Sequence, residues 1–277
     1  MTTNQPRITF TDGNTIPQVG LGVWQTPNEV AGPAVRAALA AGYRHVDTAA
    51  IYENEEGVGE GIRTSGVDRR EIFLTTKLWN DQQGYDSTLA AFDASLKRLG
   101  TDYVDLYLIH WPAPQHDRYV ETWKAFVQLN KEGRARSIGV SNFYPEHLER
   151  IIGETGVTPV INQIEIHPDF QQRAAREAHA RLGIVTESWS PLGQGKLIAH
   201  PGIGAIAAKH GKTPAQVIIR WHMDNGLVVI PKSVTPSRIE ENFQVFDFKL
   251  DEADLAAIDT LDTPGGRIGP DPMTANF

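Results

Sequence analysis

The sequence predicts an α/β fold, a (β/α)8 TIM barrel of parallel strands formed by a single domain over residues 1–277. Short apolar segments alternate with helix-length segments, which is typical of a parallel sheet with crossover helices. Eight apolar segments are present, and eight parallel strands close a barrel. No Pro/Ser-rich or charged linker divides the chain, so one large core can form. A doubly wound open sheet is the alternative fold.

The expected elements begin with a β-hairpin in ITFTDGNTIPQVG, because Asp12-Gly13 between two apolar stretches is a strong hairpin signal. We expect this hairpin to be followed by strands at 19–24, 43–48, 72–78, 103–110, 135–141, 160–166, 184–190 and 227–233. The expected helices include STLAAFDASLKRLG, YVETWKAFVQLNKEG and TPAQVIIRWHMDNG. The last two end in glycine, a residue that tolerates the left-handed conformation of a helix cap.

Composition excludes several classes of protein. A formal net charge of −8 argues against a nucleic-acid or anionic-membrane partner. No window resembles a membrane span, and MTTNQPRITF lacks the apolar core of a signal peptide, so we expect a cytoplasmic protein. The absence of cysteine excludes disulfides and thiolate metal sites. The nine histidines show no paired metal-binding motif, so no metal is expected.

Polar and ionisable residues recur where the predicted strands end. The active site of a barrel is built from the carboxyl ends of its strands, so such a recurrence indicates a site there. The residues concerned are Asp47, Lys77, His110, Ser141, Asn142, Trp189, Lys232 and Ser233.

Asp47, Tyr52, Lys77 and His110 follow three successive strands, so a barrel would bring them to one rim. A tyrosine has an ordinary pKa of about 10, and the ammonium of Lys77 would lower that pKa by favouring the phenolate. Asp47 could keep Lys77 charged, and His110 could orient a carbonyl oxygen. Such a group could protonate a carbonyl as hydride arrives. Each residue alone also has an ordinary structural explanation, as a cap, a rim aromatic, a strand end or a core histidine.

Several motifs together resemble those of the aldo-keto reductase family, in the same order and across essentially the whole chain. They are HVDTAAIYENEEGVG, TTKLWN, YLIHWP, SIGVSN, NQIEIHP and IPKSVTPSRIEEN. Their surroundings look most like the bacterial 2,5-diketo-D-gluconate reductases. The resemblance implies a barrel closed at its base by the hairpin, a monomer, and NADPH-dependent reduction of aldehyde or ketone carbonyls. It also implies a catalytic tetrad of Asp47, Tyr52, Lys77 and His110, with Tyr52 as general acid. Small dicarbonyls such as methylglyoxal, or 2,5-diketo-D-gluconate, are the implied substrates.

The resemblance further implies a nicotinamide site. Ser141, Asn142 and Gln163 correspond to residues that hydrogen-bond the nicotinamide carboxamide. Trp189 stands where the family has an aromatic side chain stacked on the nicotinamide ring, a position often held by tyrosine. A planar apolar face there would also shield the ring from water. Leu192 is a further implied cofactor contact.

The segment PKSVTPSRIEEN corresponds to the family's adenosine-phosphate site. Lys232 and Arg238 would supply cationic donors to the 2′-phosphate, and Ser233 and Thr235 would offer hydroxyls near a helix N-terminus. The positions implied to contact adenine are Glu241 and Asn242. A routine capped surface helix beginning at Thr235-Pro236 is compatible with the same residues.

Three tryptophans, Trp24, Trp79 and Trp111, follow or end predicted strands and are expected to line the mouth of a substrate pocket. The C-terminal segment TPGGRIGPDPMTANF is rich in glycine and proline and predicts a loop at the active-site rim. The family closes its pocket with such a tail, and this one is short. We therefore expect a small or open pocket.

Some features have other interpretations. In HVDTAAIYENEEGVG, Asn54 predicts a helix N-cap, followed by Glu55 and Glu56 in the first turn. GIGAIA (202–207) fits a weak dinucleotide pattern but follows His-Pro rather than a strand. Two rival functions remain: a Schiff-base barrel lyase that uses Lys77, and a cofactor-binding subunit without catalysis.

Overall fold

The computed structural model describes residues 5–275 and 277, which form an eight-stranded sheet preceded by a hairpin. The hairpin pairs β1 (Arg7–Thr9) with β2 (Thr15–Pro17) in antiparallel register. Every neighbouring pair in the larger sheet is parallel. Its strands are β3 (Leu21–Gly22), β4 (His45–Asp47), β5 (Phe73–Leu78), β6 (Val104–Ile109), β7 (Ala135–Ser141), β8 (Ile161–Glu165), β9 (Val185–Trp189) and β10 (Val228–Val229).

The sheet closes on itself between its first and last strands. Parallel bridges join Val19 to Val229 and Gly22 to Lys232, at either end of the two-residue strands β3 and β10. The strands otherwise follow one another in chain order across the sheet. The prediction of a (β/α)8 barrel is therefore confirmed, and the alternative of an open doubly wound sheet is wrong.

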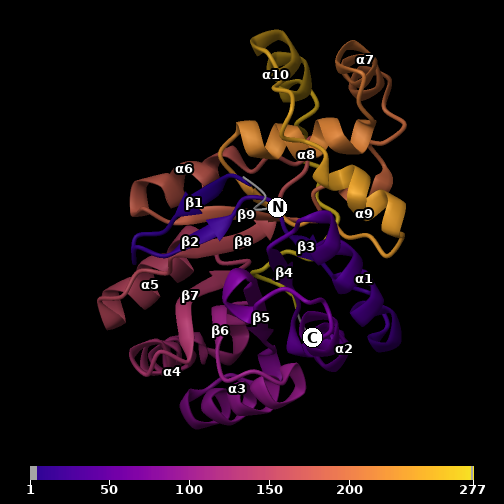
Figure 1. Ribbon diagram of the computed structural model, residues 1–277. Coiled ribbons are helices and arrows are strands. Elements are labelled where there is room, and N and C mark those ends of the chain that lie inside the picture. The colour runs from indigo at the N-terminus through magenta and orange to yellow at the C-terminus, as the bar shows by residue number, and fades with distance from the viewer. Residues whose placement is uncertain (1–4, 276) are drawn as a thin grey trace.

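Helices surround this sheet on the outside (Figure 1). The first five are α1 (Asn28–Ala41), α2 (Glu55–Arg63), α3 (Tyr85–Leu99), α4 (Tyr119–Lys131) and α5 (Pro145–Thr155). The others are α6 (Arg173–Leu182), α7 (Pro201–His210), α8 (Pro214–Asp224), α9 (Pro236–Phe243) and α10 (Glu252–Asp259). Gly133 and Gly226, predicted to follow helix ends, have φ angles of 72° and 70°, as a left-handed termination requires. The segment GIGAIA lies inside α7, so it is not a strand–turn–helix phosphate loop.

The hairpin covers the base of the barrel, where the strands begin. Phe10 and Ile16 are buried together with Phe73, the first residue of β5, and with Ile161, the first residue of β8. Just after β2, Gln18 donates from Nε2 to the backbone oxygens of Met223, in α8, and Leu227, next to β10. Apolar burial and these hydrogen bonds together close this end.

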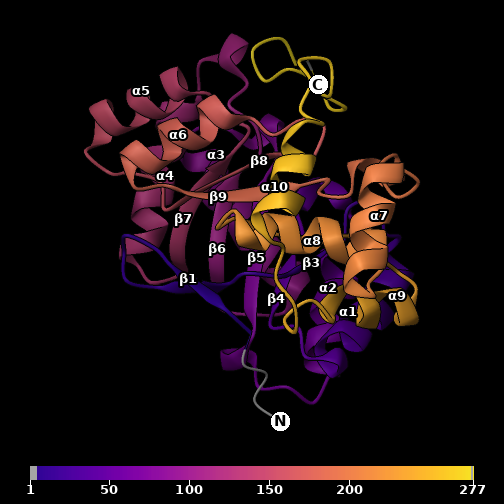
Figure 2. The same ribbon diagram turned by 90° about the horizontal axis from the view of Figure 1, so that it is seen from above.

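The C-terminal tail lies over the opposite end. After α10 the described residues form no helix or strand, and the tail loops above the sheet (Figure 2). The carboxylate of Glu165, at the end of β8, accepts hydrogen bonds from the backbone N–H groups of Ile268 (2.6 Å) and Gly269 (2.9 Å). These bonds fix the tail at the rim formed by the carboxyl ends of the strands. Among the described residues, no helix is long and apolar enough to cross a membrane.

Candidate active site

A cavity of about 620 Å³ opens among the carboxyl ends of the strands. Because the strands are parallel, residues from β4 to β10 reach the same rim. Most of the predicted site residues line this cavity: Trp24, Asp47, Tyr52, Trp79, His110, Trp111, Ser141, Asn142, Gln163, Trp189, Leu192 and Lys232.

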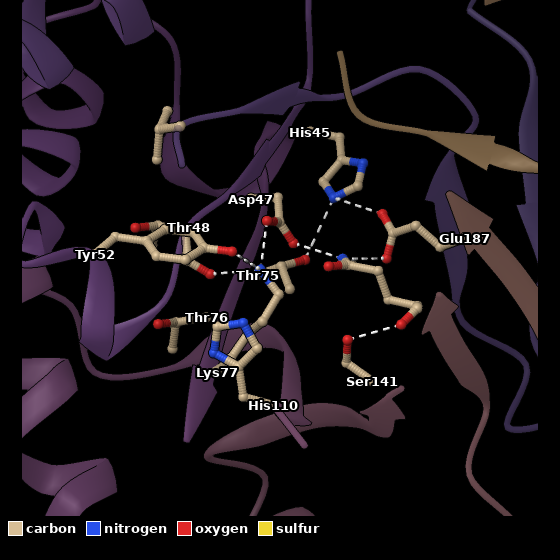
Figure 3. Close-up of polar contacts among 12 residues, drawn as sticks. His45, Asp47, Thr48, Tyr52, Thr75, Thr76, Lys77, His110, Ser141 and Glu187 are labelled. Atoms are coloured by element: carbon tan, nitrogen blue, oxygen red, sulfur yellow. Dashed lines mark hydrogen bonds and ion pairs between the residues drawn. The ribbon is translucent and has the colours of Figure 1, made fainter. Parts of the chain in front are cut away.

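Lys77 lies beneath the cavity and has no exposed side-chain surface. Its Nζ donates to Asp47 Oδ1 at 2.5 Å, to the backbone oxygen of Thr48 at 3.0 Å and to Tyr52 Oη at 3.4 Å (Figure 3). Burial alone would lower the pKa of Lys77, but the charges of Asp47 and Tyr52 raise it above the ordinary value. The amine is therefore an ammonium whose three protons all have acceptors.

Tyr52 ends a short 3-10 helix, η1 (Ala50–Tyr52), directly after β4. Burial raises the pKa of Tyr52 above 10, and the nearby Lys77 ammonium only partly opposes this. The expectation that Lys77 brings the pKa below its ordinary value is wrong, because loss of water around the phenol outweighs the attraction. The phenol consequently keeps its proton at neutral pH, as a proton donor must.

His110 follows β6 and faces Tyr52 across the cavity floor. Its ring centroid lies 5.6 Å from that of Tyr52 and 5.2 Å from that of Trp79, both in edge-on contact. Burial and the Lys77 ammonium hold the pKa of His110 well below its ordinary value. A neutral imidazole is thus placed beside the phenol.

A line of hydrogen bonds runs along the rim from β6 to β9. Ser141 Oγ donates to the backbone oxygen of Gln163 (2.7 Å), and Asn142 Nδ2 donates to that of His110 (2.9 Å). Trp189 Nε1 donates to Asn142 Oδ1 at 2.8 Å. The side chains predicted to form the nicotinamide site are therefore held in mutual contact on one wall of the cavity.

The residues predicted to bind the adenosine phosphates lie farther out, on α9 and the loop before it. Lys232 and Arg238 are exposed, and neither has an ion-pair partner within the part of the chain that the structure describes. Thr235 precedes α9 and donates its N–H to Ser233 Oγ at 3.3 Å. The last two of this group are Glu241, which accepts a hydrogen bond from Thr213 Oγ1 (3.0 Å), and the buried Asn242.

Aromatic side chains form the mouth of the cavity, as predicted for Trp24, Trp79 and Trp111. Trp24 is 44% exposed. The tail adds Phe277, whose ring centroid lies 5.5 Å from that of Trp79 and 5.2 Å from that of Trp111. The short tail therefore still reaches across the mouth.

Comparisons with known proteins agree with this geometry. Residues 17–263 match the model of the aldo/keto reductase family. The chain belongs to the aldo/keto reductase family. It is 63% identical to an aldo-keto reductase of Mycolicibacterium smegmatis over 272 residues, covering 98% of each chain. It is 56% identical to methylglyoxal reductase DkgA of Escherichia coli over 271 residues, covering 97% of this chain and 98% of the relative.

Solved structures show the same relationship. A crystal structure of a Gox0644 variant in complex with NADPH superposes with a TM-score of 0.96, at 59% identity and covering 99% of each chain. These comparisons confirm the predicted family and its enzyme class, an NADP-dependent oxidoreductase.

One detail of the reductase differs from the prediction. Asn54 stands at the N-cap position of α2, but its side chain makes no cap hydrogen bond. Its Nδ2 instead donates to the backbone oxygens of Val23 and Thr26, which ties the helix to the loop after β3. Glu55 is buried, accepts a hydrogen bond from Thr76 and forms an ion pair with Arg98. It therefore joins α2 to its neighbours in addition to placing a negative charge in the first turn of the helix.

Sequence reasoning missed two buried residues of the reductase, His45 and Glu187. Glu187 Oε2 lies 2.8 Å from Gln163 Nε2, and Glu187 Oε1 lies 3.8 Å from His45 Nε2. His45 stands two residues before Asp47, on the same face of β4, and Glu187 is an acid in the middle of VTESW. Such a charge inside a buried strand is the signal that could have revealed them.

Potential ligand atoms of His45, Asp47 and Glu187 all lie within 4.8 Å of one another. The carboxylates, however, already accept hydrogen bonds from the Lys77 ammonium and the Gln163 amide. An ammonium at 2.5 Å from Asp47 would repel a metal cation, so the arrangement favours a hydrogen-bonded network.

Proposed function

We propose that this reductase uses NADPH to reduce aldehyde and ketone carbonyls to alcohols, with Tyr52 as the proton donor. One observation carries the proposal: the Lys77 ammonium, closed off from solvent, contacts both Asp47 and the Tyr52 hydroxyl under an aromatic-walled cavity. A protonated phenol held beside a fixed cation is suited to supplying a proton where negative charge develops on oxygen.

The residues around the cavity fit NADPH. When bound, NADPH supplies the hydride for carbonyl reduction. Ser141, Asn142 and Gln163 offer polar atoms on one wall, suited to a carboxamide, and Trp189 offers a planar face that excludes water. Lys232 and Arg238 are exposed and have no ion-pair partner among the described residues, so their side chains are suited to a phosphate. Relatives in complex with NADPH or NADP support the same choice of cofactor.

The four residues of the tetrad have separate roles. Tyr52 gives its proton to the carbonyl oxygen, and Lys77 stabilises the phenolate that remains. Asp47 keeps Lys77 charged and in place. His110, neutral and beside Tyr52, orients the carbonyl oxygen. Such proton transfer contributes about 10²–10⁴-fold to the rate.

We propose small dicarbonyls as the substrate class. Relatives named methylglyoxal reductase support this choice. The ring of Phe277 packs across Trp79 and Trp111, so the tail narrows the mouth of the cavity. A mouth of this kind favours compact substrates. Strong preference for bulky steroids over methylglyoxal would contradict the proposal.

The test is Tyr52→Phe, which removes the proton donor and leaves the ring. We expect NADPH oxidation with methylglyoxal or an aromatic aldehyde to fall by at least about 10²-fold, with NADPH affinity nearly unchanged. The matched control is Tyr103→Phe, because the buried Tyr103 hydroxyl has no hydrogen-bond partner among the described residues. Full turnover by Tyr52→Phe would refute the role of Tyr52.

The geometry disfavours one of the two rival functions, the Schiff-base lyase. A Schiff-base lyase needs an unprotonated amine that meets substrate, whereas Lys77 is buried, charged and outside the cavity wall. Borohydride trapping of an adduct on Lys77 would reverse this conclusion. NADPH binding without turnover on a broad panel of carbonyls would instead favour a non-catalytic subunit.

A further inference from the structure

A second buried carboxylate lies beneath the tetrad. Glu187, in the middle of β9, has no exposed side-chain surface. Gln163 Nε2 donates one hydrogen to Glu187 Oε2 at 2.8 Å and the other to Asp47 Oδ2 at 2.9 Å. The two carboxylates are thus joined through one amide, and Asp47 in turn contacts Lys77.

The charges around Glu187 do not balance if both carboxylates are ionised. Asp47 and His45 face it from β4, Lys77 from β5, and Gln163 from β8, while its register partner on β10 is the apolar Val228. Burial, together with the charges of Lys77 and Arg7, lowers the pKa of His45 to about 3, so His45 is neutral. One ammonium, already directed at Asp47, therefore faces two carboxylates.

The side chain of Glu187 is also incompletely hydrogen-bonded among the residues that the structure describes. Glu187 Oε1 has no hydrogen-bond partner within the described residues. An ionised oxygen left in this state carries a large desolvation penalty, whereas a protonated carboxyl avoids it. Burial and the charge of Asp47 accordingly raise the pKa of Glu187 to about 8.

We propose that Glu187 is a positioning residue that holds a proton inside the barrel and, through Gln163 and Asp47, sets the pH range in which Tyr52 exchanges its proton. The inference rests on the proposed function of Tyr52. When Glu187 releases its proton to solvent at alkaline pH, the added negative charge raises the pKa of Tyr52. The phenol then remains a proton donor at higher pH than it would without Glu187.

The main experiment compares wild type with Glu187→Gln in the complete enzyme. The measured quantity is kcat/KM for NADPH-dependent reduction of nitrobenzaldehyde from roughly pH 6 to roughly pH 10. Without the ionisable group, we expect the alkaline fall in rate to move to lower pH by at least about half a unit, which is about threefold in rate on that limb. Superimposable profiles would overturn the inference.

The matched control is Glu55→Gln, which neutralises another buried carboxylate. Glu55 pairs with Arg98 rather than with the tetrad, so its loss should leave the pH at which activity falls unchanged. An equal shift in both variants would mean that any buried neutralisation has this effect, and would overturn the specific role of Glu187. If Tyr52→Phe remains active, the proposed function fails. If only the Glu187→Gln profile is unchanged, this inference alone fails.

A second measurement needs no substitution. In wild-type enzyme with isotope-labelled glutamate carboxyl carbons, NMR should show a glutamate that titrates near pH 8. The signal should be absent from Glu187→Gln if that variant folds. A wild-type spectrum in which every glutamate titrates in the acidic range would overturn the inference independently of any kinetic result.

Discussion

The two ends of the barrel hold their charges in opposite ways. At the base, Asp105 meets Arg69 at 2.8 Å and Arg136 at 3.3 Å, and both guanidinium groups stack on Tyr103. Asp105 and Arg136 line an open cavity of about 470 Å³ together with Arg7. At the carboxyl end, Lys77 is sealed from solvent and faces the two carboxylates of Asp47 and Glu187. Two cations face one carboxylate at the base, whereas one cation faces two carboxylates in a desolvated site at the carboxyl end.

The difference separates stability from catalysis. An ion pair that water reaches contributes little to stability, whereas loss of one partner from a buried pair leaves an uncompensated charge. Stability at the base comes instead from apolar packing by residues such as Phe10 and Ile16. Exposed ion pairs at the base should therefore tolerate changes of charge, whereas its apolar core should not tolerate changes of volume. The carboxyl end should respond most strongly to changes of charge.

The largest effect is expected for Lys77→Met, which keeps much of the side-chain volume but removes the cation. Asp47 would lose its partner, so we expect a loss of about 3 kcal/mol in the free energy of unfolding, together with at least about 10²-fold in kcat. Urea denaturation measures the free energy of unfolding, and NADPH oxidation measures kcat. The control, Lys209→Met, removes an exposed ammonium paired with Asp251 and should keep full activity. Wild-type activity in Lys77→Met would contradict the contrast between the two ends.

Phe10→Ala tests the apolar base. The Phe10 ring is buried against Phe73, so its truncation should cost about 3 kcal/mol in the free energy of unfolding. The activity of the folded fraction should remain near wild type, because the cavity and tetrad lie at the other end. Denaturation curves and kcat/KM per folded molecule check both parts. A loss of kcat without a loss of stability would contradict the assignment of stability to the base and catalysis to the carboxyl end.

Glu187→Gln should change how stability depends on pH. The pKa of Glu187 is about 8 in the folded protein, above that of an unfolded glutamate. Between about pH 5 and about pH 8 the unfolded chain releases this proton while the folded protein keeps it, so the group makes wild-type stability fall as pH rises. The variant lacks this effect. Its stability relative to wild type should improve by roughly 1 kcal/mol per pH unit across the window, as measured by urea denaturation. A constant difference would contradict the shifted pKa.

The smallest effect is expected for Arg70→Ala at the base. Arg70 pairs with Asp68 at 2.6 Å, but both side chains are open to water. Their attraction is screened and is offset by the entropy of holding two long side chains. We expect Tm and activity indistinguishable from wild type. A clear loss of Tm would show that surface charge at the base contributes more than the comparison allows.

Much of the fold could be predicted from the sequence because each strand carries its own pattern. Eight apolar segments and turn residues such as Asp12-Gly13 are local signals, and the structure has the elements they indicate. The predicted boundaries were less accurate at the seam, where the first and last strands of the barrel, β3 and β10, meet. Strand β3 covers only Leu21–Gly22 within the expected 19–24, because the contact with β10 is reduced to short bridges. Pairing between distant strands is absent from any local pattern.

For the candidate site, residue type at strand ends indicated Asp47, Lys77 and His110, and the structure brings them together around Tyr52. Glu187 and Phe277 were missed because their positions depend on distant contacts. The pattern of a strand buried on both faces does not show which residues point into the barrel. The direction of the Tyr52 pKa was wrong for a related reason, since burial follows from the whole fold.

The seam of the barrel has a consequence for how the protein is made. The bridge from Val19 to Val229 and the hydrogen bond from Gln18 to Leu227 join residues at opposite ends of the chain, the latter pair separated by 209 positions. During synthesis, one edge of the first barrel strand stays unpaired until the last strand has left the ribosome. Contacts this distant are slow to form, and an open edge is prone to aggregation. Assembly of the cavity therefore requires that the last strand has already been synthesised.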